Sequence, residues 1–316
     1  MNKIFELLGL GNVGSQKKKK LVVISILVTS ALIVALLAAF VIVQIASRPQ
    51  GDPVDSDGDG EGDNSGYISV SVPASNVGMG DLLLVNKSNH YKFSESQLVE
   101  IPTSGNKYGL RTSGMRADKV ALEALNKMMD ALYKNVTDAN IVVTTVYRSS
   151  EAQTALNSST PAGASDFHTG RLFELKDGEN YAGVDAVEKY EWLYKNAHKY
   201  GFIVRYPADT EDKAYSEKTG VGDFAYAFRY VGVAHATYMY NNKLCLEEYI
   251  ELLRSSYEYG TAELTVKAGS ADYVIYYVRS AGEATNIQVP EKYKYEISGN
   301  NIDGYIVTVN RSARAN

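Results

Sequence analysis

Cysteine is almost absent from this chain: Cys245 is the only one among 316 residues. A single thiol excludes an intrachain disulfide and any metal site built from several cysteines. Because it lies between two leucines, we expect this thiol to behave as a small buried apolar side chain. The sequence also lacks a Gly-x-Ser-x-Gly elbow, a P-loop and a Gly-x-Gly-x-x-Gly turn before a helix. These absences argue against serine and cysteine nucleophiles and against the common nucleotide-binding loops.

The net charge of −5 is unevenly distributed along the chain. Lys17–Lys20 is a basic run, whereas Asp52–Asp63 carries most of the acidic surplus. No basic patch recurs later in the sequence, which argues against nucleic-acid binding and favours a membrane boundary.

Leu21–Ala46 is a run of 26 residues without a charged side chain. At about 1.5 Å per residue a helix of this length exceeds the hydrocarbon core of about 30 Å, so the run predicts a tilted transmembrane helix. A secretory signal peptide is the alternative, but its apolar core has only about 7–15 residues. Because Lys17–Lys20 precedes the run, the positive-inside rule predicts a cytoplasmic tail at 1–20 and an extracytoplasmic remainder.

Residues 47–66 are predicted to form an acidic flexible linker. Gly, Asp and Ser dominate it, and such a composition buries too little apolar surface to offset the entropy of ordering. Asp55, Asp57 and Asp59 match the opening of a calcium loop, but the position of the closing acid is Gly66. A tether is therefore favoured over a calcium site.

The folded region is expected to begin near Tyr67 and to mix helices with strands. Leu122, Leu125, Met129 and Leu132 recur at helical spacing and predict an amphipathic helix over Arg116–Asn135. A second helix is predicted over Ala186–Tyr200, ended by Gly201, and a third over Leu246–Leu253. Predicted strands are Asp81–Asn86, Ile141–Tyr147, Glu263–Lys267, Tyr273–Arg279, Asn286–Val289, Lys294–Ile297 and Tyr305–Val309.

Three stretches carry a resemblance to a known family. They are Tyr147-Arg148-Ser149 with Gln153 after it, the text Glu-Trp-Leu-Tyr-Lys-Asn-Ala-His-Lys-Tyr-Gly-Phe-Ile-Val-Arg-Tyr-Pro at 191–207, and Phe-Arg-Tyr-Val-Gly at 228–232. The sequence resembles the zinc D-alanyl-D-alanine carboxypeptidases of the VanY-like family over roughly 81–253. The resemblance implies an α+β fold in which a small antiparallel sheet has helices on one side.

The segment Ala164–Leu175 resembles the first metal-binding segment of that family, Ser-x-His-x-x-Gly followed by three residues and Asp. Ser165 and Gly170 keep its frame. The position of the family's histidine ligand holds Phe167, and that of its aspartate ligand holds Glu174.

The second metal segment of the family reads Glu-Pro-Trp-His before Phe-Arg-Tyr-Val-Gly. Aligned on 228–232, the position of the catalytic base is Phe224 and that of the third ligand is Ala227. A zinc hydrolase needs about three ligands, an open position for water and a base. With Phe167 also lacking a lone pair, the sequence predicts no catalytic residue and no metal or other cofactor.

A rearranged zinc site is the alternative. His168, one residue after the family position, Glu174 and Asp223 are the remaining candidates for its ligands.

Substrate-binding residues are predicted from the same resemblance: Arg148, Ser149, Gln153 and Ser165. The guanidinium of Arg148 is suited to a peptide carboxylate or an oxyanion. A structural ion pair of Arg148 with an Asp or Glu is the competing interpretation.

We therefore expect five parts: a cytoplasmic tail at 1–20, a single-pass transmembrane helix at 21–46, a linker at 47–66, a carboxypeptidase-like domain at 67–258 and a small β-rich segment at 259–316. Two functions remain open. One is a degenerate, membrane-anchored protein that binds a cell-wall peptide or a protein partner outside the cytoplasm. The other is an active metallopeptidase that trims peptidoglycan stem peptides through the rearranged zinc site.

Overall fold

The computed structural model describes residues 66–92, 98–222 and 224–315. The chain divides into two compact units, 1–63 and 64–316, and only the second contains described residues. The predicted anchor Leu21–Ala46 lies outside the described residues. Within the described ranges no helix has the length and apolar character needed to cross a membrane.

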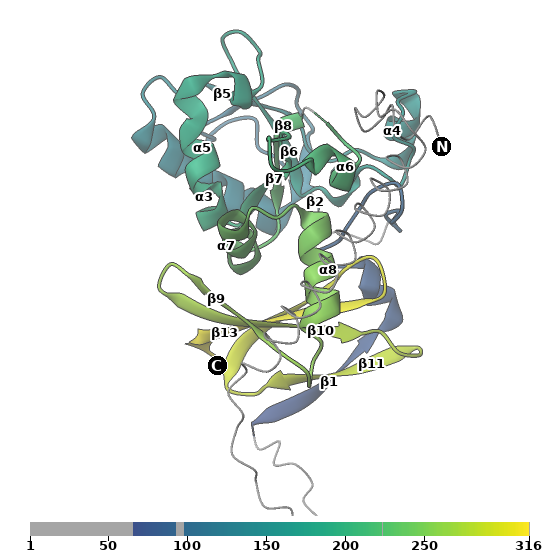
Figure 1. The fold of residues 1–316 in the computed structure, drawn as a ribbon. Coiled ribbons are helices and arrows are strands. Elements are labelled where there is room, and N and C mark those ends of the chain that lie inside the picture. The colour runs from purple at the N-terminus through teal and green to yellow at the C-terminus, as the bar shows by residue number, and fades with distance from the viewer. Residues whose placement is uncertain (1–65, 93–97, 223, 316) are drawn as a thin grey trace, which may run out of the picture. The chain divides into compact units, whose positions relative to one another are not determined.

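A five-stranded sheet is the centre of the first half of the described chain (Figure 1). Its strand order is β3-β5-β6-β8-β7, and every neighbouring pair is antiparallel except β3 with β5. The strands are β3 (Gly109–Leu110), β5 (Ile141–Thr145), β6 (Leu172–Asp177), β7 (Phe202–Tyr206) and β8 (Phe224–Tyr230). A separate two-stranded sheet pairs β2 (Leu98–Glu100) with β4 (Arg116–Asp118).

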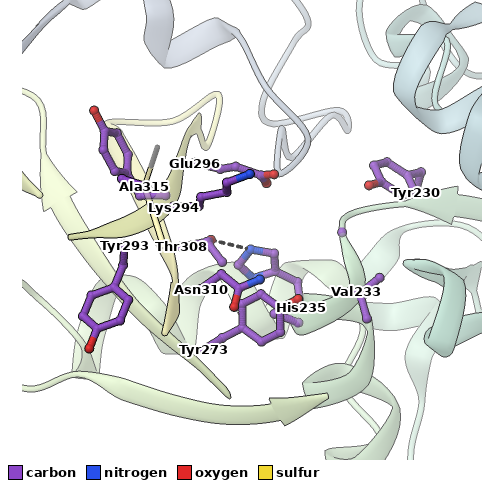
Figure 2. A pocket seen from close by; sticks show the side chains of 13 residues that line it. Tyr230, Val233, His235, Tyr273, Tyr293, Lys294, Glu296, Thr308, Asn310 and Ala315 are labelled. Carbon is purple, nitrogen blue, oxygen red and sulfur yellow. Dashed lines mark hydrogen bonds between the residues drawn. The ribbon is translucent and has the colours of Figure 1, made fainter. Parts of the chain in front are cut away.

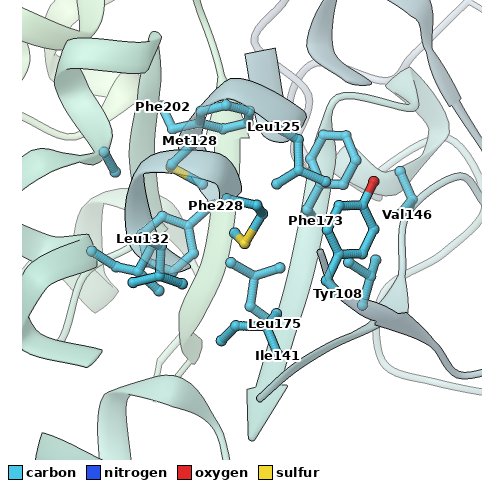
Figure 3. Packing of buried hydrophobic residues seen from close by; sticks show 14 of the residues in the cluster. Tyr108, Leu125, Met128, Leu132, Ile141, Val146, Phe173, Leu175, Phe202 and Phe228 are labelled. Carbon is cyan, nitrogen blue, oxygen red and sulfur yellow. The ribbon is translucent and has the colours of Figure 1, made fainter. Parts of the chain in front are cut away.

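Helix α3 (Lys119–Asn135) covers one face of the five-stranded sheet. Figure 3 shows Leu125, Met128 and Leu132 of this helix against Phe173 and Phe228 of β6 and β8. The predicted amphipathic helix is confirmed, but it begins at Lys119. The reason is that residues 116–118 pair in β4 and that the Asp118 carboxylate accepts hydrogen bonds from the first helical amides, as an N-cap does.

The remaining helices are short. The predicted helix 186–200 is divided into η4 (Glu188–Tyr190), α5 (Glu191–Asn196) and η5 (Ala197–Tyr200), and Gly201 ends it with a φ of 86°. The others are η1 (Ala74–Gly78), α4 (Ser150–Ala155), η2 (Asp166–Thr169), η3 (Val184–Ala186), α6 (Tyr215–Thr219), α7 (Val233–Asn242) and α8 (Leu246–Ser256).

The C-terminal residues form a four-stranded antiparallel sheet of order β12-β13-β10-β9. Its strands are β9 (Leu264–Ala268), β10 (Ala271–Arg279), β12 (Tyr293–Gly299) and β13 (Gly304–Arg314). The remaining strand of this region, β11 (Ala284–Pro290), pairs with β1 (Tyr67–Pro73), the first strand of the described chain. All five predicted C-terminal strands are thus present, and the fold is the expected mixed α+β type.

Helices α7 and α8 pack between the two sheets. Ile203 of β7 and Ile275 and Ile306 of the four-stranded sheet belong to one apolar cluster with Ala236 and Ile250 of these helices. Helices α3 and α5 pack on the opposite face of the five-stranded sheet. The expectation that helices lie on one side of this sheet is therefore met only in part, because α7 and α8 pack on the other side.

The predicted strand Asp81–Asn86 is not a strand. Leu82–Val85 are buried as expected, but their backbone groups bond to side chains and loops instead of a sheet. Arg229 and Arg205 donate to the carbonyls of Leu83 and Val85, each at 3.4 Å. An apolar run predicts burial, but it does not specify which groups satisfy the backbone.

Those two arginines belong to a buried ion network. Asp166 Oδ2 lies 2.6 Å from Arg205 Nε, and Asp166 Oδ1 lies 3.0 Å from Arg229 Nε, with none of the three side chains exposed. Arg205 also makes two hydrogen bonds with Glu247 of α8, at 2.8 and 3.0 Å. The network thus joins η2, β7, β8 and α8.

Removing one member of this network should destabilise the fold strongly. We expect Arg205→Met to lower the free energy of unfolding by about 3–5 kcal/mol, since Asp166 and Glu247 would lose their partner. Urea unfolding of the full chain measures this. The matched control is Lys195→Met, which removes an exposed pair with Glu191 and should cost about 0.5 kcal/mol or less. Equal effects of the two substitutions would contradict a central role for the network.

Candidate functional site

The candidate site begins where β5 ends. Ser149 caps α4, because its Oγ accepts a hydrogen bond from the amide of Ala152 at 3.2 Å. This places Arg148 and Gln153 side by side, and Arg148 Nη1 donates to Gln153 Oε1 at 2.8 Å. Gln153 is buried and donates in turn to the carbonyl of Thr160 at 2.8 Å. Arg148 and Gln153, both predicted to bind substrate, are therefore in contact, and Gln153 is fixed by its bond to Thr160.

Arg148 makes no ion pair with a carboxylate of the described residues; its hydrogen-bond partner is the neutral amide of Gln153. Burial lowers the pKa of Arg148, and the negative charge of Glu174 opposes that shift. The guanidinium carbon lies 4.7 Å from the centre of the Phe167 ring, a cation–π contact. The arginine thus keeps hydrogen-bonding capacity over an aromatic surface.

Phe167 is part of a small apolar cluster beneath this arginine. Its ring centre lies 6.1 Å from that of Phe224, and the Phe224 ring stacks on Tyr206 at 5.7 Å. Ala227 and Leu172 complete the buried part of the cluster. Three positions that the sequence assigned to the family's ligands and base are therefore packed against one another as hydrophobic side chains.

Glu174 is the one acidic side chain at these four positions. The register of β6 and β8 pairs it directly with Ala227. Its Oε1 lies 3.6 Å from Lys176 Nζ, and both side chains are largely buried. The fold therefore brings all four family positions together, but they offer a single carboxylate.

His168 is fully buried, and both of its ring nitrogens have backbone partners. Nδ1 lies 2.6 Å from the carbonyl of Arg148, and Nε2 accepts from the amide of Gly163 at 3.0 Å. Nδ1 is therefore the protonated nitrogen of a neutral ring. Burial lowers the pKa of His168, an effect that the hydrogen bond to the Arg148 carbonyl opposes. In this arrangement His168 holds the chain and presents no lone pair to Glu174.

The other predicted residues are placed as follows. Ser165 is buried immediately before η2, and its hydroxyl makes no hydrogen bond with the described residues. Asp223 lies outside the described residues. Within the ranges that are described, no group of three His, Cys, Asp or Glu side chains is arranged to hold a metal ion.

Zinc does not fit the residues that the described chain supplies here. A zinc site uses nitrogen, oxygen or sulfur donors, three of them even in an open catalytic site. Phe167 and Ala227 have none, and their side chains are part of a packed apolar cluster. Arg148 can instead bind an anionic group next to an apolar surface formed by Phe167, Phe224 and Ala227, which we call the apolar floor.

The residues that sequence reasoning missed are Asp166, Arg205 and Arg229, which position this floor. Asp166 adjoins Phe167, while Arg205 and Arg229 lie in the strands that carry Tyr206 and Ala227. The sequence does contain a signal for the two arginines, because each interrupts an otherwise apolar strand. A charge in a buried strand requires a buried partner, although the pattern does not indicate which residue it is.

Known proteins of one family are similar to this chain. Residues 114–233 match the family model described as VanY, D-alanyl-D-alanine carboxypeptidase. A D-alanyl-D-alanine carboxypeptidase of Enterococcus faecium is 30% identical over 250 residues, covering 76% of this chain and 78% of that protein. A protein of the same description from Enterococcus faecalis is 39% identical over 89 residues, which are 28% of this chain and 30% of that protein.

Among solved structures, the vancomycin resistance D,D-dipeptidase VanXYg in complex with a D-Ala-D-Ala phosphinate analogue is similar with a TM-score of 0.66 and 27% identity. The match covers 78% of this chain and 99% of that chain. The similarity therefore extends beyond the residues that the family model matches.

Proposed function

The chain belongs to the VanY D-alanyl-D-alanine carboxypeptidase family, and from that premise we propose that it binds a cell-wall peptide without hydrolysing it. The observation that carries the proposal is the apolar cluster of Phe167, Phe224 and Ala227 below a retained Arg148–Gln153 pair. The part of the site suited to holding a peptide is present, whereas side chains able to activate water are replaced.

Peptide binding would rest on Arg148. Its planar guanidinium can form paired, charge-assisted hydrogen bonds with a terminal carboxylate. Gln153 occupies Nη1 and thereby fixes the orientation of the fork. The ring of Phe167 and its neighbours form a floor against which small apolar side chains, such as those of alanine residues, lose contact with water. VanXYg, which is similar in fold, was solved with a D-Ala-D-Ala phosphinate analogue, and this supports a peptide end of that kind as the ligand.

Hydrolysis would need a base to take the proton of the attacking water and groups to stabilise the developing charge. The position of the family's base holds Phe224, whose ring stacks on Tyr206. Glu174 remains, and its position opposite Ala227 favours it as a member of any relocated site. An active metallopeptidase with His168, Glu174 and Asp223 as ligands is the second candidate, and in it His168 would have to give up one of its two backbone partners to bind a metal.

The purified full-length chain should contain no stoichiometric zinc and should release no D-alanine from a stem pentapeptide, with or without added zinc. The physical reason is the loss of donor atoms at Phe167, Phe224 and Ala227. Metal analysis and a D-alanine release assay test this together.

Two variants separate the candidate functions. His168→Ala should reduce stability, because two backbone partners lose their bonds, and should leave the metal content unchanged. One zinc per chain that is lost on His168→Ala or Glu174→Ala would establish the relocated site instead.

Arg148→Ala should weaken binding of D-alanyl-D-alanine. A hydrogen bond to a charged group contributes about 1.5–3 kcal/mol, so the dissociation constant should rise about tenfold or more. Isothermal titration calorimetry of the full-length chain gives this value. Lys134→Ala, in the exposed last turn of α3, removes the same charge away from the site and is the control. Unchanged affinity in Arg148→Ala would assign Arg148 a purely structural role.

We also propose that the protein is anchored in the cell membrane by Leu21–Ala46, with its folded part extracytoplasmic. The support is the uncharged run behind Lys17–Lys20. Protease added to intact cells should remove the chain beyond Arg48 and leave the N-terminus protected, while a cytoplasmic protein of the same cells stays intact. A cleaved, soluble product in the medium would instead indicate a signal peptide.

A further inference from the structure

A cavity of about 530 Å³ lies between the start of α7 and the four-stranded sheet (Figure 2). It shares no lining residue with the Arg148 site. Its polar and aromatic lining includes Tyr230, Tyr273, Lys294, Glu296, Thr308 and Asn310. The volume falls in the range of about 300–1,000 Å³ that is usual for small-molecule sites.

The register of the sheet explains why polar groups gather here. Asn310 of β13 pairs with Lys294 on one side and with Tyr273 on the other. Two residues earlier on β13, on the same face, Thr308 pairs with Glu296 on one side and with Ile275 on the other. Side chains of directly paired residues share a face of a sheet. This face is apolar where it packs on α7 and α8, as Ile275 does, and becomes polar toward the outer strand β12.

His235 makes one wall of the cavity rigid. Its Nε2 lies 2.8 Å from Thr308 Oγ1, as Figure 2 shows, and its Nδ1 lies 2.8 Å from the hydroxyl of Tyr249. Burial lowers the pKa of His235 to about 3, so the ring is neutral at physiological pH. A fixed, uncharged wall means that the charge of the cavity comes from Glu296 and Lys294.

Glu296 and Lys294 are both exposed, and their side chains make neither an ion pair nor a hydrogen bond with any described residue. They lie on the same face of β12, two residues apart, which is about 6.6 Å along a strand. Opposite charges this close commonly pair, yet these two remain available.

The surroundings of Glu296 favour a cation. Partial burial raises its pKa, and the negative charge of Asp81 raises it further, although more than a third of the residue is open to solvent. Asp81 lines an adjoining cavity of about 310 Å³ that also includes Glu296. Burial raises the pKa of Tyr273, whose ring lines the same cavity as Glu296. A carboxylate beside aromatic rings is a suitable environment for an ammonium group.

We propose that this cavity binds a short zwitterionic peptide, its ammonium group at Glu296 and the tyrosines and its carboxylate at Lys294 and Asn310. A simple anion would be repelled by Glu296, and a simple cation by Lys294. A neutral sugar would leave both charges unpaired. A dipeptide separates its terminal charges by one Cα–Cα step of about 3.8 Å more than an amino acid does, which suits the spacing of the two side chains. This site is independent of the proposed function at Arg148.

The test uses calorimetric titration of the full-length Arg148→Ala chain, in which binding at the Arg148 site is expected to be weakened. The probes are D-alanyl-D-alanine and L-alanyl-L-alanine, each also in N-acetylated and C-amidated form. We expect saturable binding of the free dipeptides and about tenfold weaker binding of each capped form. The two stereoisomers distinguish a cell-wall peptide from an ordinary one.

Charge variants then assign each end of the ligand. Glu296→Gln should weaken binding of the free dipeptide and remove the difference in affinity between the free and N-acetylated forms. Lys294→Met should remove the difference in affinity between the free and C-amidated forms. Glu291→Gln and Lys292→Met, exposed just before β12 and outside the cavity lining, are the matched controls and should change nothing. Thermal unfolding confirms that each variant is folded.

Two results would overturn the proposal. One is the absence of saturable binding up to about 10 mM dipeptide, beyond which affinity is negligible. The other is binding that neither cap nor either charge variant alters, which would indicate a neutral ligand or a different site. Neither result would affect the function proposed at Arg148, which is tested by the difference in affinity between the unaltered chain and Arg148→Ala.

Discussion

The rest of the structure depends on one carboxylate, Asp166, that bonds two buried arginines. Each of its oxygens accepts from a different guanidinium, Arg205 of β7 and Arg229 of β8. Burying three charges is costly unless every one is paired, so the strands, the turn at η2 and the carbonyls of Leu83 and Val85 must be placed together. This requirement fixes the geometry around Phe167, the residue next to Asp166.

Buried ion pairs hold the backbone of this region in place. The backbone that positions Phe167, Glu174 and Ala227 is fixed by the Asp166 network and by the β6–β8 register. Apolar side chains can therefore fill the centre without loss of the fold, while Arg148 and Gln153 keep their mutual contact. The residues that hold the fold of this region are thus different from those at the four family positions.

Local patterns in the sequence were sufficient for the elements whose stability is local. The apolar spacing of α3, the left-handed Gly201 and the alternating strands after residue 262 are all present as predicted. The assignment of Arg148 and Gln153 to one site came from family resemblance, and their hydrogen bond is seen only in the structure. Three features were not predictable, namely the non-strand conformation of Leu82–Val85, the pairing of Asp166, and the partners of His168. Each depends on groups distant in sequence, which periodicity does not encode.

The pairing of β1 with β11 has a consequence for synthesis of the chain. Tyr67 pairs with Pro290, so 223 residues (290 − 67) separate the two partners. At about 5–20 residues per second, a ribosome needs roughly 10–45 s to supply the second strand. During that interval Val70 and Val72, which later pack on the C-terminal core, have no partner strand. The first strand of this domain to be synthesised is thus among the last to pair. A chain truncated before β11 would leave β1 as an unpaired strand that is prone to aggregation.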